Sequence, residues 1–550
     1  RGRDDGEKNA MKIETTGNEV QFLLDGEDFF RELSAQLDRV IQAPASVDAY
    51  VRLAFWEADE HCGIDRVGMR TLGGMLRKVA DAGHTVQFIY WKPGALAGHI
   101  LKKGWTLPPA MPEYRSKISH VVGHDRKVIH GSVQVYREEH KGWFIGTTNH
   151  QKIVIFSIDG VLKAIVGGMN LTNKSYAPVS HDPRAKATGM IGALIATGSE
   201  VEGAANWHDT AVMLTGPAAA AVEEEWLRRW KKRRPSPARE PAKAPAQRPV
   251  EGGHAVTILT TNSELRTREM HIREALCERI AAADRYIYLE NYVLSDPILV
   301  AALAARLQAN PHLAVLFVTG KDTEPYSYMN RLTLTRLVLA AGGDGTIMLE
   351  DHGPREKIEE TFKERAVLGG DFSNPLRVDQ LELLRNPWGA KDVFRYRTPE
   401  GVEKRVPIGK IREAISRRVV FAYPTQGGVK PIVGGFYVHS KLVLVDDDTA
   451  FVGSANLSYR SMVYDGEMCV RIAGAAAKDI RVALFKHFDL DYADAEAIQG
   501  AILSGKLQAN ATMLAKTKNP PLGHAFLRFY GAADFSADSP PLKWCNHFWH

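Results

Sequence analysis

The chain has 550 residues, more than one hydrophobic core usually organises, so its length predicts roughly two to four domains. An apolar fraction of 45% with 25% charged residues is ordinary for a globular protein and excludes a disordered, collagen-like or coiled-coil chain. The net charge of +5 favours phosphate-bearing partners but is too small for a dedicated nucleic-acid binder. No apolar run reaches the roughly 18 residues of a transmembrane helix, so any membrane contact is expected to be peripheral.

The cysteines and the first residues bear on metal sites, disulfides and export. Four widely spaced cysteines form no Cys-x-x-Cys pair, so we expect neither a zinc site nor a disulfide framework; they are Cys62, Cys277, Cys469 and Cys545. The opening RGRDDGEKNA lacks the basic, apolar and small-residue segments of a secretory signal. A signal that has been removed and another export route both stay open, so the localisation is unassigned.

The first part of the chain predicts an extension followed by an α/β unit. We expect an N-terminal extension over 1–20 and a first unit over 21–232. This unit is expected to contain strands at 49–56 and 86–91 with a helical pattern between them, at Leu72, Met75, Leu76 and Val79. A strand with the sequence Asn149-His150-Gln151-Lys152, a turn at Asp159-Gly160 and a strand ending in VGGMN (166–170) follow. The unit closes with a strand and a helix over 213–230.

The second part repeats this order after a linker. The segment 233–252 is rich in Pro, Ala and charge, which predicts an extended linker, with a long surface loop as the alternative. The second unit, 253–495, has strands at 286–290 and 314–318, a box at 439–441, the loop VGSAN (452–456) and a closing piece at 471–488; a tail occupies 496–550. This pattern predicts an α/β fold with two duplicated domains, each a mixed sheet flanked by helices, packed face to face as a pseudo-twofold pair.

Each unit carries one His-x-Lys box on a strand, His150 with Lys152 and His439 with Lys441. Residues i and i+2 of a strand share a face, so the imidazole and the ammonium lie side by side. Such a pair suits a phosphodiester, because the cation holds phosphate oxygens while histidine supplies a nucleophile or a proton. One box alone is usually a solvated strand edge, but two matched boxes, each followed by a glycine loop with Asn, predict a catalytic site.

Alignment of the two units also gives each histidine a carboxylate. Counting back seven residues from the shared Gly216 and Gly474 gives Asp209 and Glu467. A catalytic imidazole needs an acceptor on its second nitrogen, so we predict that Asp209 serves His150 and that Glu467 serves His439. Other histidines are expected to be surface or structural residues: His124, His181, His208 and His547.

These features resemble the phospholipase D superfamily, whose hallmark is a duplicated His-x-Lys-x4-Asp box. The segment YVHSKLVLVDDDTAFVGSANLSYRSMVYDGEMCV (437–470) fits it strictly, with Asp446 as the box aspartate, and IYLEN (287–291) and WHDTAVMLTGPA (207–218) are further similarities. The resemblance implies that His150 attacks phosphorus to form a phosphohistidine and that His439 is the general acid and base. It implies no metal or other cofactor, and it assigns phosphate binding to Lys152, Lys441, Asn170 and Asn456, with Ser454 adding a hydrogen bond.

The first box departs from the family pattern in two ways. Ser157 stands where the pattern has aspartate, and we predict that Asp159, two residues later, takes its structural place. Asp209 stands 39 positions after Asn170, whereas Glu467 stands 11 positions after Asn456, so the first unit has an insertion over 171–206. It is either a lid or substrate loop beside the site, or a surface excursion.

The implied reaction is hydrolysis or transphosphatidylation of a glycerophospholipid, which releases a head group and phosphatidic acid. A secreted bacterial lipase effector, or toxin, with a delivery or immunity partner is a further expectation. One alternative is an endonuclease of the same superfamily, although the basic run 228–234 that points to nucleic acid is expected to be a solvated helix end. The other is an inactive phosphate-binding homologue. Tail aromatics such as Phe526 and Phe529 are expected to pack on the body.

Overall fold

The structure is a computed structural model. It describes residues 12–65, 70–91, 133–138, 148–175, 207–232, 241–263, 269–320, 330, 333–334, 337, 340–341, 393–397, 403–407, 417–426, 437–507 and 525–529. We call the part up to residue 232 the first half and the part from residue 254 the second half.

The first half alternates strands with helices, as its apolar pattern predicts. Strand β2 is buried along its whole length, and helix α1 places Phe29, Phe30, Leu33, Leu37 and Val40 on one buried face. Its elements are β1 (Lys12–Leu24), α1 (Asp25–Gln42), β2 (Ala49–Phe55), α2 (Leu72–Asp81), β3 (Thr85–Trp91), β4 (Val133–Glu138), β5 (Ile153–Ile158), β6 (Val161–Gly167), η2 (Asn173–Ser175), β7 (Trp207–His208), β8 (Thr210–Thr215) and α5 (Pro217–Lys232).

The second half repeats the same order. Helix α7 begins where Asp296 caps the N–H of Leu299 at 2.9 Å and Pro297 occupies the first turn. Its elements are β9 (His254–Asn262), β10 (Glu269–Met270), α6 (His271–Ala282), β11 (Tyr286–Glu290), α7 (Pro297–Ala309), β12 (Ala314–Val318), β13 (Val393–Arg397), β14 (Glu403–Pro407), β15 (Val419–Gln426), β16 (Tyr437–Val438), β17 (Leu442–Val445), β18 (Thr449–Gly453), α13 (Tyr459–Val463), β19 (Glu467–Ala473), α14 (Ala475–His487), α15 (Ala495–Leu503) and β20 (Ala525–Phe529).

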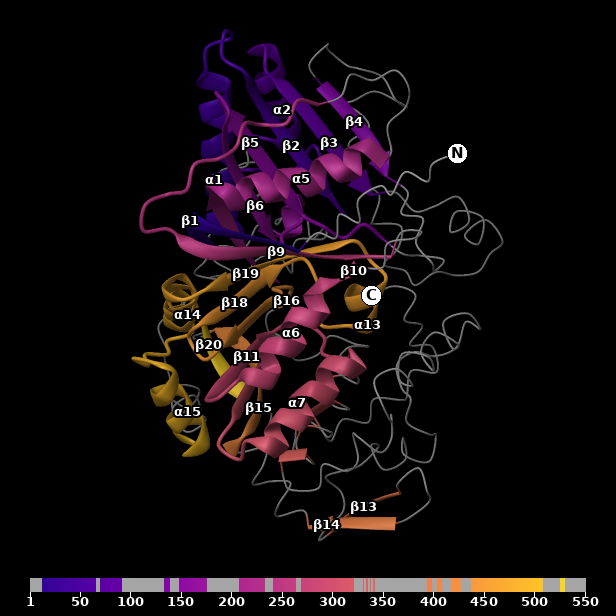
Figure 1. Cartoon of the computed structure of the whole chain (residues 1–550), viewed down its shortest axis with the longest axis vertical. Helices are drawn as coiled ribbons and strands as arrows, with labels where there is room; N and C mark the ends of the chain where they lie inside the picture. Colours follow the sequence, from indigo (N-terminus) through magenta and orange to yellow (C-terminus); the bar gives the residue numbers. More distant parts are fainter. Residues whose placement is uncertain are drawn as a thin grey trace, which may run out of the picture.

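One mixed sheet runs through both halves (Figure 1). Its order is β20-β15-β12-β11-β17-β18-β19-β9-β1-β8-β6-β5-β2-β3-β4, so that β9 to β15 mirror β1 to β4 about the junction of β1 with β9. These two strands pair antiparallel, from Lys12 opposite Leu259 to Asn18 opposite His254. The duplicated α/β fold is confirmed. The face-to-face packing is wrong, because the halves join edge to edge through backbone hydrogen bonds.

Two predicted boundaries also need correction. Residues 12–20 are not an extension, because they form most of β1, whose exposed and partly buried residues alternate as in a strand with one face covered. The second half continues beyond residue 495, because α15 buries Ile498, Ala501 and Ile502, and β20 pairs with β15. Residues 1–11 lie outside the described part of the chain.

The described part of the predicted linker, 241–250, contains no helix or strand and lies against the first half. The N–H of Val250 donates to the carbonyl of Gly17 at 2.7 Å, and Arg52 donates to the carbonyl of Ala242 at 2.6 Å. Gln247 donates to the carbonyl of Gly160 at 2.8 Å. The segment is therefore extended, as predicted, but held by polar contacts along its length.

Candidate active site

The two boxes lie at the junction, each bonded to the closing segment of the opposite half. Strand β7 pairs in parallel with β16, and the backbone N–H of His439 donates to the carbonyl of His208 at 2.8 Å. In the matching place, the N–H of His150 donates to the carbonyl of Gly466 at 2.8 Å. The pseudo-twofold relation thus brings the box of one half beside the start of the closing strand of the other half.

This crossing exchanges the predicted histidine–carboxylate partners. Nδ1 of His150 lies 3.0 Å from Oε1 of Glu467, and Nδ1 of His439 lies 2.6 Å from Oδ2 of Asp209. All four side chains are buried or nearly so. The prediction that Asp209 serves His150 and Glu467 serves His439 is therefore wrong. Sequence register located both carboxylates, but their assignment depends on the symmetry axis between the halves.

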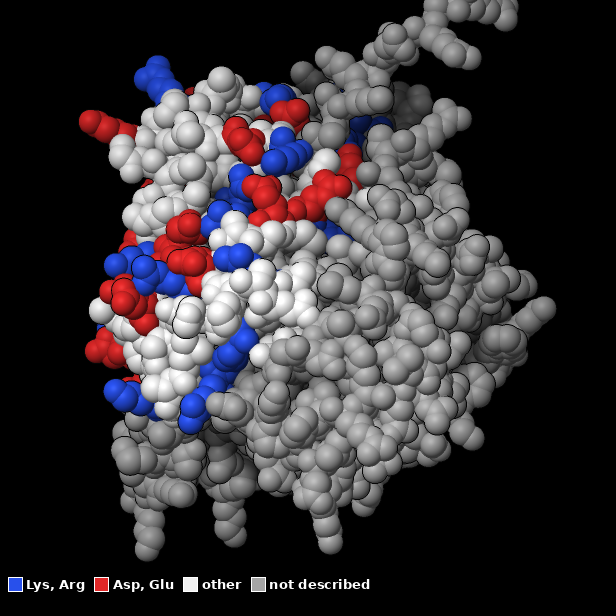
Figure 2. Space-filling model, turned by 60° about the horizontal axis from the view of Figure 1, so that its bottom comes forward, with Lys and Arg blue, Asp and Glu red and all other residues white. Residues whose placement is uncertain are grey.

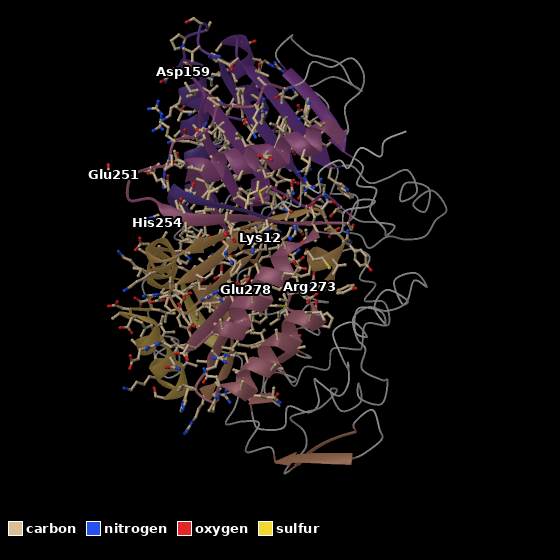
Figure 3. All side chains as sticks on the ribbon, viewed as in Figure 1. Lys12, Asp159, Glu251, His254, Arg273 and Glu278 are labelled. Atoms are coloured by element: carbon tan, nitrogen blue, oxygen red, sulfur yellow. The ribbon has the colours of Figure 1, made fainter. Side chains whose placement is uncertain are left out.

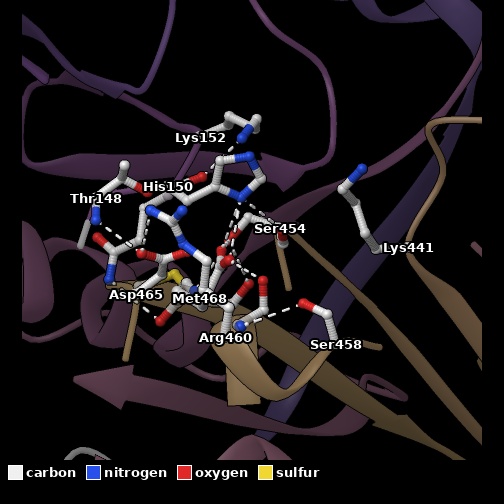
Figure 4. A network of polar contacts seen from close by, with 12 residues as sticks. Thr148, His150, Lys152, Lys441, Ser454, Ser458, Arg460, Asp465 and Met468 are labelled. Atoms are coloured by element: carbon white, nitrogen blue, oxygen red, sulfur yellow. Dashed lines mark hydrogen bonds and ion pairs between the residues drawn. The ribbon is translucent and has the colours of Figure 1, made fainter. Parts of the chain in front are cut away.

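Glu467 is held by two serine hydroxyls. Ser454 Oγ donates to Oε2 at 2.5 Å and Ser461 Oγ donates to Oε1 at 2.7 Å. Figure 4 shows Ser454 beside His150 in this network of polar contacts. Ser454 is fully buried, and its hydroxyl also accepts the N–H of Met468 at 3.1 Å. These contacts occupy the hydroxyl that was predicted to bind phosphate. Ser454 is instead a residue that positions Glu467.

Asp209 has a different environment. Its Oδ1 accepts the N–H of Thr210 at 2.9 Å, and its Oδ2 lies 3.4 Å from the indole nitrogen of Trp207. Gly168, the counterpart of Ser454, lies so close that a Cβ would meet Asp209 Oδ1 at 2.1 Å. The glycine loop of the first half therefore makes room for Asp209, whereas the loop of the second half gives Glu467 a hydroxyl partner, Ser454.

Each box lysine is buried against an aromatic ring. Lys152 Nζ lies 5.7 Å from the ring centre of Trp56, and Lys441 Nζ lies 5.2 Å from that of Tyr292. Lys152 also donates to the carbonyl of His150 at 2.7 Å, and Lys441 donates to the carbonyl of His439. The sequence analysis missed both aromatics. Their signal was available, since each stands six residues after a matched strand tyrosine, Tyr50 or Tyr286.

Burial and the neighbouring charges shift the pKa values of the site's lysines and carboxylates in opposite directions. Burial lowers the pKa of Lys152 to about 7 and that of Lys441 to about 8, although Glu467 and Asp209 attract both ammonium groups. Burial raises the pKa of Asp209 to about 7 and that of Glu467 to about 7, against the same two lysines. Since the lysines and carboxylates of both halves perturb one another, the two boxes form a single site.

His150 has the ionisation state that an attacking imidazole needs. Burial, with Lys152 and Lys441 nearby, holds the pKa of His150 well below its usual value. The contact of Nδ1 with Glu467 leaves Nε2 as the nitrogen that can react. A neutral ring with a free Nε2 is a nucleophile or a proton acceptor at neutral pH.

The two loop asparagines are placed as predicted, one in each half. Asn170 and Asn456 are 1% and 3% exposed, and within the described residues their amide oxygens have no hydrogen-bond partner. A buried amide that the protein leaves incompletely paired is available to a ligand. Their role in phosphate binding stays a prediction.

In the described part of the first half, no aspartate takes the place of the structural aspartate of the second box. The Asp446 carboxylate accepts the N–H groups of residues 284, 285 and 286 at 2.6, 2.8 and 2.9 Å. Asp159 does not take this place. Asp159 and Gly160, with φ of 51° and 76°, form a two-residue turn, and Figure 3 shows Asp159 at the outer end of the first half. Ser157 remains in strand β5, opposite Tyr50.

The start of the basic run 228–234 is not the predicted solvated face. Arg228 donates to Glu225 at 2.6 Å and to Glu269 at 2.6 Å, and the buried Arg229 donates to Gln151 between the first box residues at 2.5 Å. Trp230 is also buried, whereas Lys231 is exposed as predicted. Arg228 and Arg229 therefore serve internal contacts, and the side chains of 232–234 lie outside the described part of the chain. Over the described part of the face in Figure 2, acidic and basic side chains are interspersed.

Other predicted features fall largely outside the described residues. Of the insertion, only 171–175 are described, and they carry the short helix η2. His124, His181, His547 and the side chains of Phe526 and Phe529 are not described, whereas β20 itself pairs with β15 and buries Leu527. Among the helices that the structure describes, none has the length and apolar character to span a membrane.

One comparison with known proteins, the family model, agrees with the motif. Residues 400–489 match the family model described as "Cardiolipin synthase, PLD-like domain". No curated protein matches the chain significantly. Among solved structures, a polyphosphate kinase from Porphyromonas gingivalis has 10% identity and a TM-score of 0.40 over 89% of this chain. A phosphatidylserine synthase from Haemophilus influenzae has 9% identity and a TM-score of 0.39, with 90% of this chain and 88% of that chain covered.

The chain spans 55% of the length of the polyphosphate kinase. The family model covers the second box, and the duplicated sheet brings a matching box from the first half into the same site. The match to a PLD-like domain and the two His-x-Lys boxes in one site agree with the resemblance to the phospholipase D superfamily that the sequence motifs predict.

Proposed function

We propose that this protein is a phospholipase D-type phosphodiesterase that cleaves glycerophospholipids to phosphatidic acid and a head-group alcohol. The observation that carries the proposal is the pair of box histidines, each in contact through Nδ1 with a buried carboxylate from the opposite half. This contact directs the reactivity of both rings to Nε2. Two such imidazoles and two lysines in one site supply what a two-step cleavage of a phosphodiester requires.

In the first step, Nε2 of His150 donates its electron pair to phosphorus, and the bond from phosphorus to the head-group oxygen breaks. His439 gives its Nε2 proton to that oxygen, so the head group leaves as an alcohol. Glu467 stabilises the positive charge that develops on the His150 ring. Asp209 does the same for the protonated His439 ring before it gives up its proton.

In the second step, His439 takes a proton from water, the water oxygen attacks phosphorus, and the bond from phosphorus to His150 breaks. An alcohol in place of water would give transphosphatidylation. Lys152 and Lys441 offset the charge of the phosphate oxygens during both steps. Because both ammonium groups are buried, their electrostatic effect on the substrate is stronger than it would be in water.

The test is incubation of the full chain with vesicles of mixed phospholipids and, separately, with plasmid DNA, both in excess chelator. Head-group release that is lost in His439→Ala and retained in the exposed-site control His312→Ala supports the proposal. Plasmid nicking without lipid cleavage would favour the endonuclease. Phosphate binding without any cleavage would favour the inactive homologue.

Among the described residues, Arg228 and Arg229 of the basic run that pointed to nucleic acid are engaged within the protein, which does not support the endonuclease. The effector role, a delivery or immunity partner and a peripheral membrane contact remain predictions. A head-group profile of the released alcohols would refine the substrate class.

A further inference from the structure

His208 is buried at the junction of the two halves and contacts both. Its Nδ1 lies 2.8 Å from Oδ1 of Asp25, in the first half, and its Nε2 lies 2.9 Å from Oε1 of Glu290, in the second half. All three side chains are fully buried. A ring whose two nitrogens both face carboxylate oxygens donates two hydrogen bonds, which requires a proton on each nitrogen. His208 is therefore an imidazolium bridge.

The backbone of His208 supports the segment between β16 and β17, which carries the second box. Its carbonyl accepts the N–H of His439 at 2.8 Å and the N–H of Ser440 at 3.1 Å. The next residue, Asp209, contacts the His439 ring through its carboxylate at 2.6 Å. Residues 208 and 209 therefore fix both the backbone and the side chain of His439.

Asp25 connects the bridge to Asp209. Its Oδ1 accepts the N–H of Asp209 at 3.1 Å, and its own N–H donates to the carbonyl of Asp209 at 2.8 Å. Its φ of 58° lies in the left-handed region, which is costly for a residue other than glycine. These contacts retain that backbone conformation, so the position of Asp209 depends on Asp25 and, through it, on His208.

The surroundings favour the charged ring. Burial opposes protonation, but Glu290 and Asp25 outweigh it and raise the pKa of His208 well above its usual value. Nε2 of His487 lies 3.6 Å from Asp25 Oδ2, and the His487 ring stacks on His208 at 5.5 Å between ring centres. Asp25, His208 and His487 offer potential metal ligands within 4.8 Å, yet both His208 nitrogens are at hydrogen-bond distance from carboxylates.

The other histidine has no such bridge. Gly466 occupies the place of His208 before Glu467. It has no side chain to form a bridge, and its backbone carbonyl accepts the N–H of His150. The carboxylate of Glu467 is held by Ser454 and Ser461 instead. A defect at His208 should therefore affect the His439 branch of the site selectively.

We propose that His208 is a positioning residue for the general acid: it ties Asp25 to Glu290 across the junction and thereby aligns Asp209 with His439. The proposal rests on the proposed function, in which His439 protonates the leaving alcohol. A poor leaving group needs that proton and a good one does not, which gives a selective readout.

The test compares kcat/KM of His208→Gln on two phosphatidyl esters, one with choline and one with p-nitrophenol as leaving group. Both values report formation of the phosphohistidine. We expect a loss of about 100-fold on the choline ester and less than about 3-fold on the p-nitrophenyl ester. The matched control is Glu223→Gln, which changes a buried carboxylate in an ion pair with Arg52, outside the described contacts of the boxes, and should treat both esters alike.

An equal loss on both esters in His208→Gln would overturn the proposal. If that variant does not fold, Glu290→Gln keeps the shape of the bridge and should show a selective loss of about 10-fold. Nitrogen NMR of the wild-type histidines tests the bridge independently of activity: a singly protonated His208 ring at pH 7 contradicts it. A wild-type protein with the doubly protonated ring but inactive on both esters would refute the proposed function and, with it, the role of His208 in catalysis.

Discussion

The two halves of the molecule place their boxes alike but support them differently. Glu467, which serves His150, is held by two serine hydroxyls. Asp209, which serves His439, is held by backbone, by Trp207 and by the bridge through Asp25 to His208. The two halves therefore share the placement of histidine and carboxylate but differ in the residues that surround each carboxylate. Unequal support is what two histidines need if one attacks phosphorus and the other transfers protons.

Each half also contains a buried ion pair. The residue seven positions after the shared glycine is Glu223 in α5 and Arg481 in α14. Glu223 pairs with Arg52 of β2 at 2.5 Å, whereas Arg481 pairs with Asp447 at 2.8 Å, so the two signs are exchanged. What both halves retain is a compensated buried pair, because either charge alone would be costly to bury.

The largest effect is expected from removal of the box histidines. His150→Ala and His439→Ala should each lower kcat on phospholipid by about 10³-fold or more, because neither step proceeds without its imidazole. Trapping of the phosphoenzyme separates the roles. With a p-nitrophenyl ester, His439→Ala should still form the phosphohistidine and His150→Ala should not. Labelling of His439 in the His150→Ala variant would reverse the assignment.

A somewhat smaller effect should come from the carboxylates and would test their crossing. Asp209→Asn and Glu467→Gln should each lower kcat/KM by about 10²-fold, because the imidazole loses its charged partner. In double-mutant cycles, Asp209→Asn should be non-additive with His439→Ala and closer to additive with His150→Ala. The opposite pattern would contradict the crossing and favour a pairing of Asp209 with His150.

The dependence of kcat/KM on pH should be bell-shaped and centred between about 7 and 8. As pH falls through about 7, Asp209 and Glu467 take up protons and lose their charge. As pH rises through about 7 to 8, Lys152 and Lys441 lose theirs. Rates measured from about pH 5 to about pH 10 with one lipid, with folding followed by tryptophan fluorescence, give the profile. A flat profile would contradict this account.

The smallest expected effect is on stability and comes from Asp446 and Asp159, which differ in their contacts. Asp446→Ser, which makes the second box resemble the first, should lower the free energy of unfolding by about 2 kcal/mol, because three N–H groups lose a carboxylate acceptor. Asp159→Ala is the matched change in the first half and should cost less than about 1 kcal/mol. Urea unfolding measures both. Equal losses would mean that Asp159 does the work of Asp446 after all.

Much of the site follows from the sequence alone. The spacing of His150 and Lys152, and of His439 and Lys441, identified the two boxes. Their predicted place on a strand is wrong, because each box lies just before a strand, β5 or β17. The duplication also located Asp209 and Glu467, and Asp159-Gly160 predicted the turn between β5 and β6. These last inferences hold because they depend on the order of residues within the repeat and on turn chemistry, which are properties of the sequence itself.

Only the tertiary structure decided which carboxylate contacts which histidine. The two halves are related by an axis between β1 and β9, where their strands join edge to edge. Because of this relation, each carboxylate contacts the histidine of the other half, and His208 is buried between Asp25 and Glu290. The same packing turned Ser454 from a predicted phosphate ligand into a support for Glu467. Spacing within a repeat gives the order of its residues, but contacts between repeats depend on how the two copies are related in space, which no local pattern encodes.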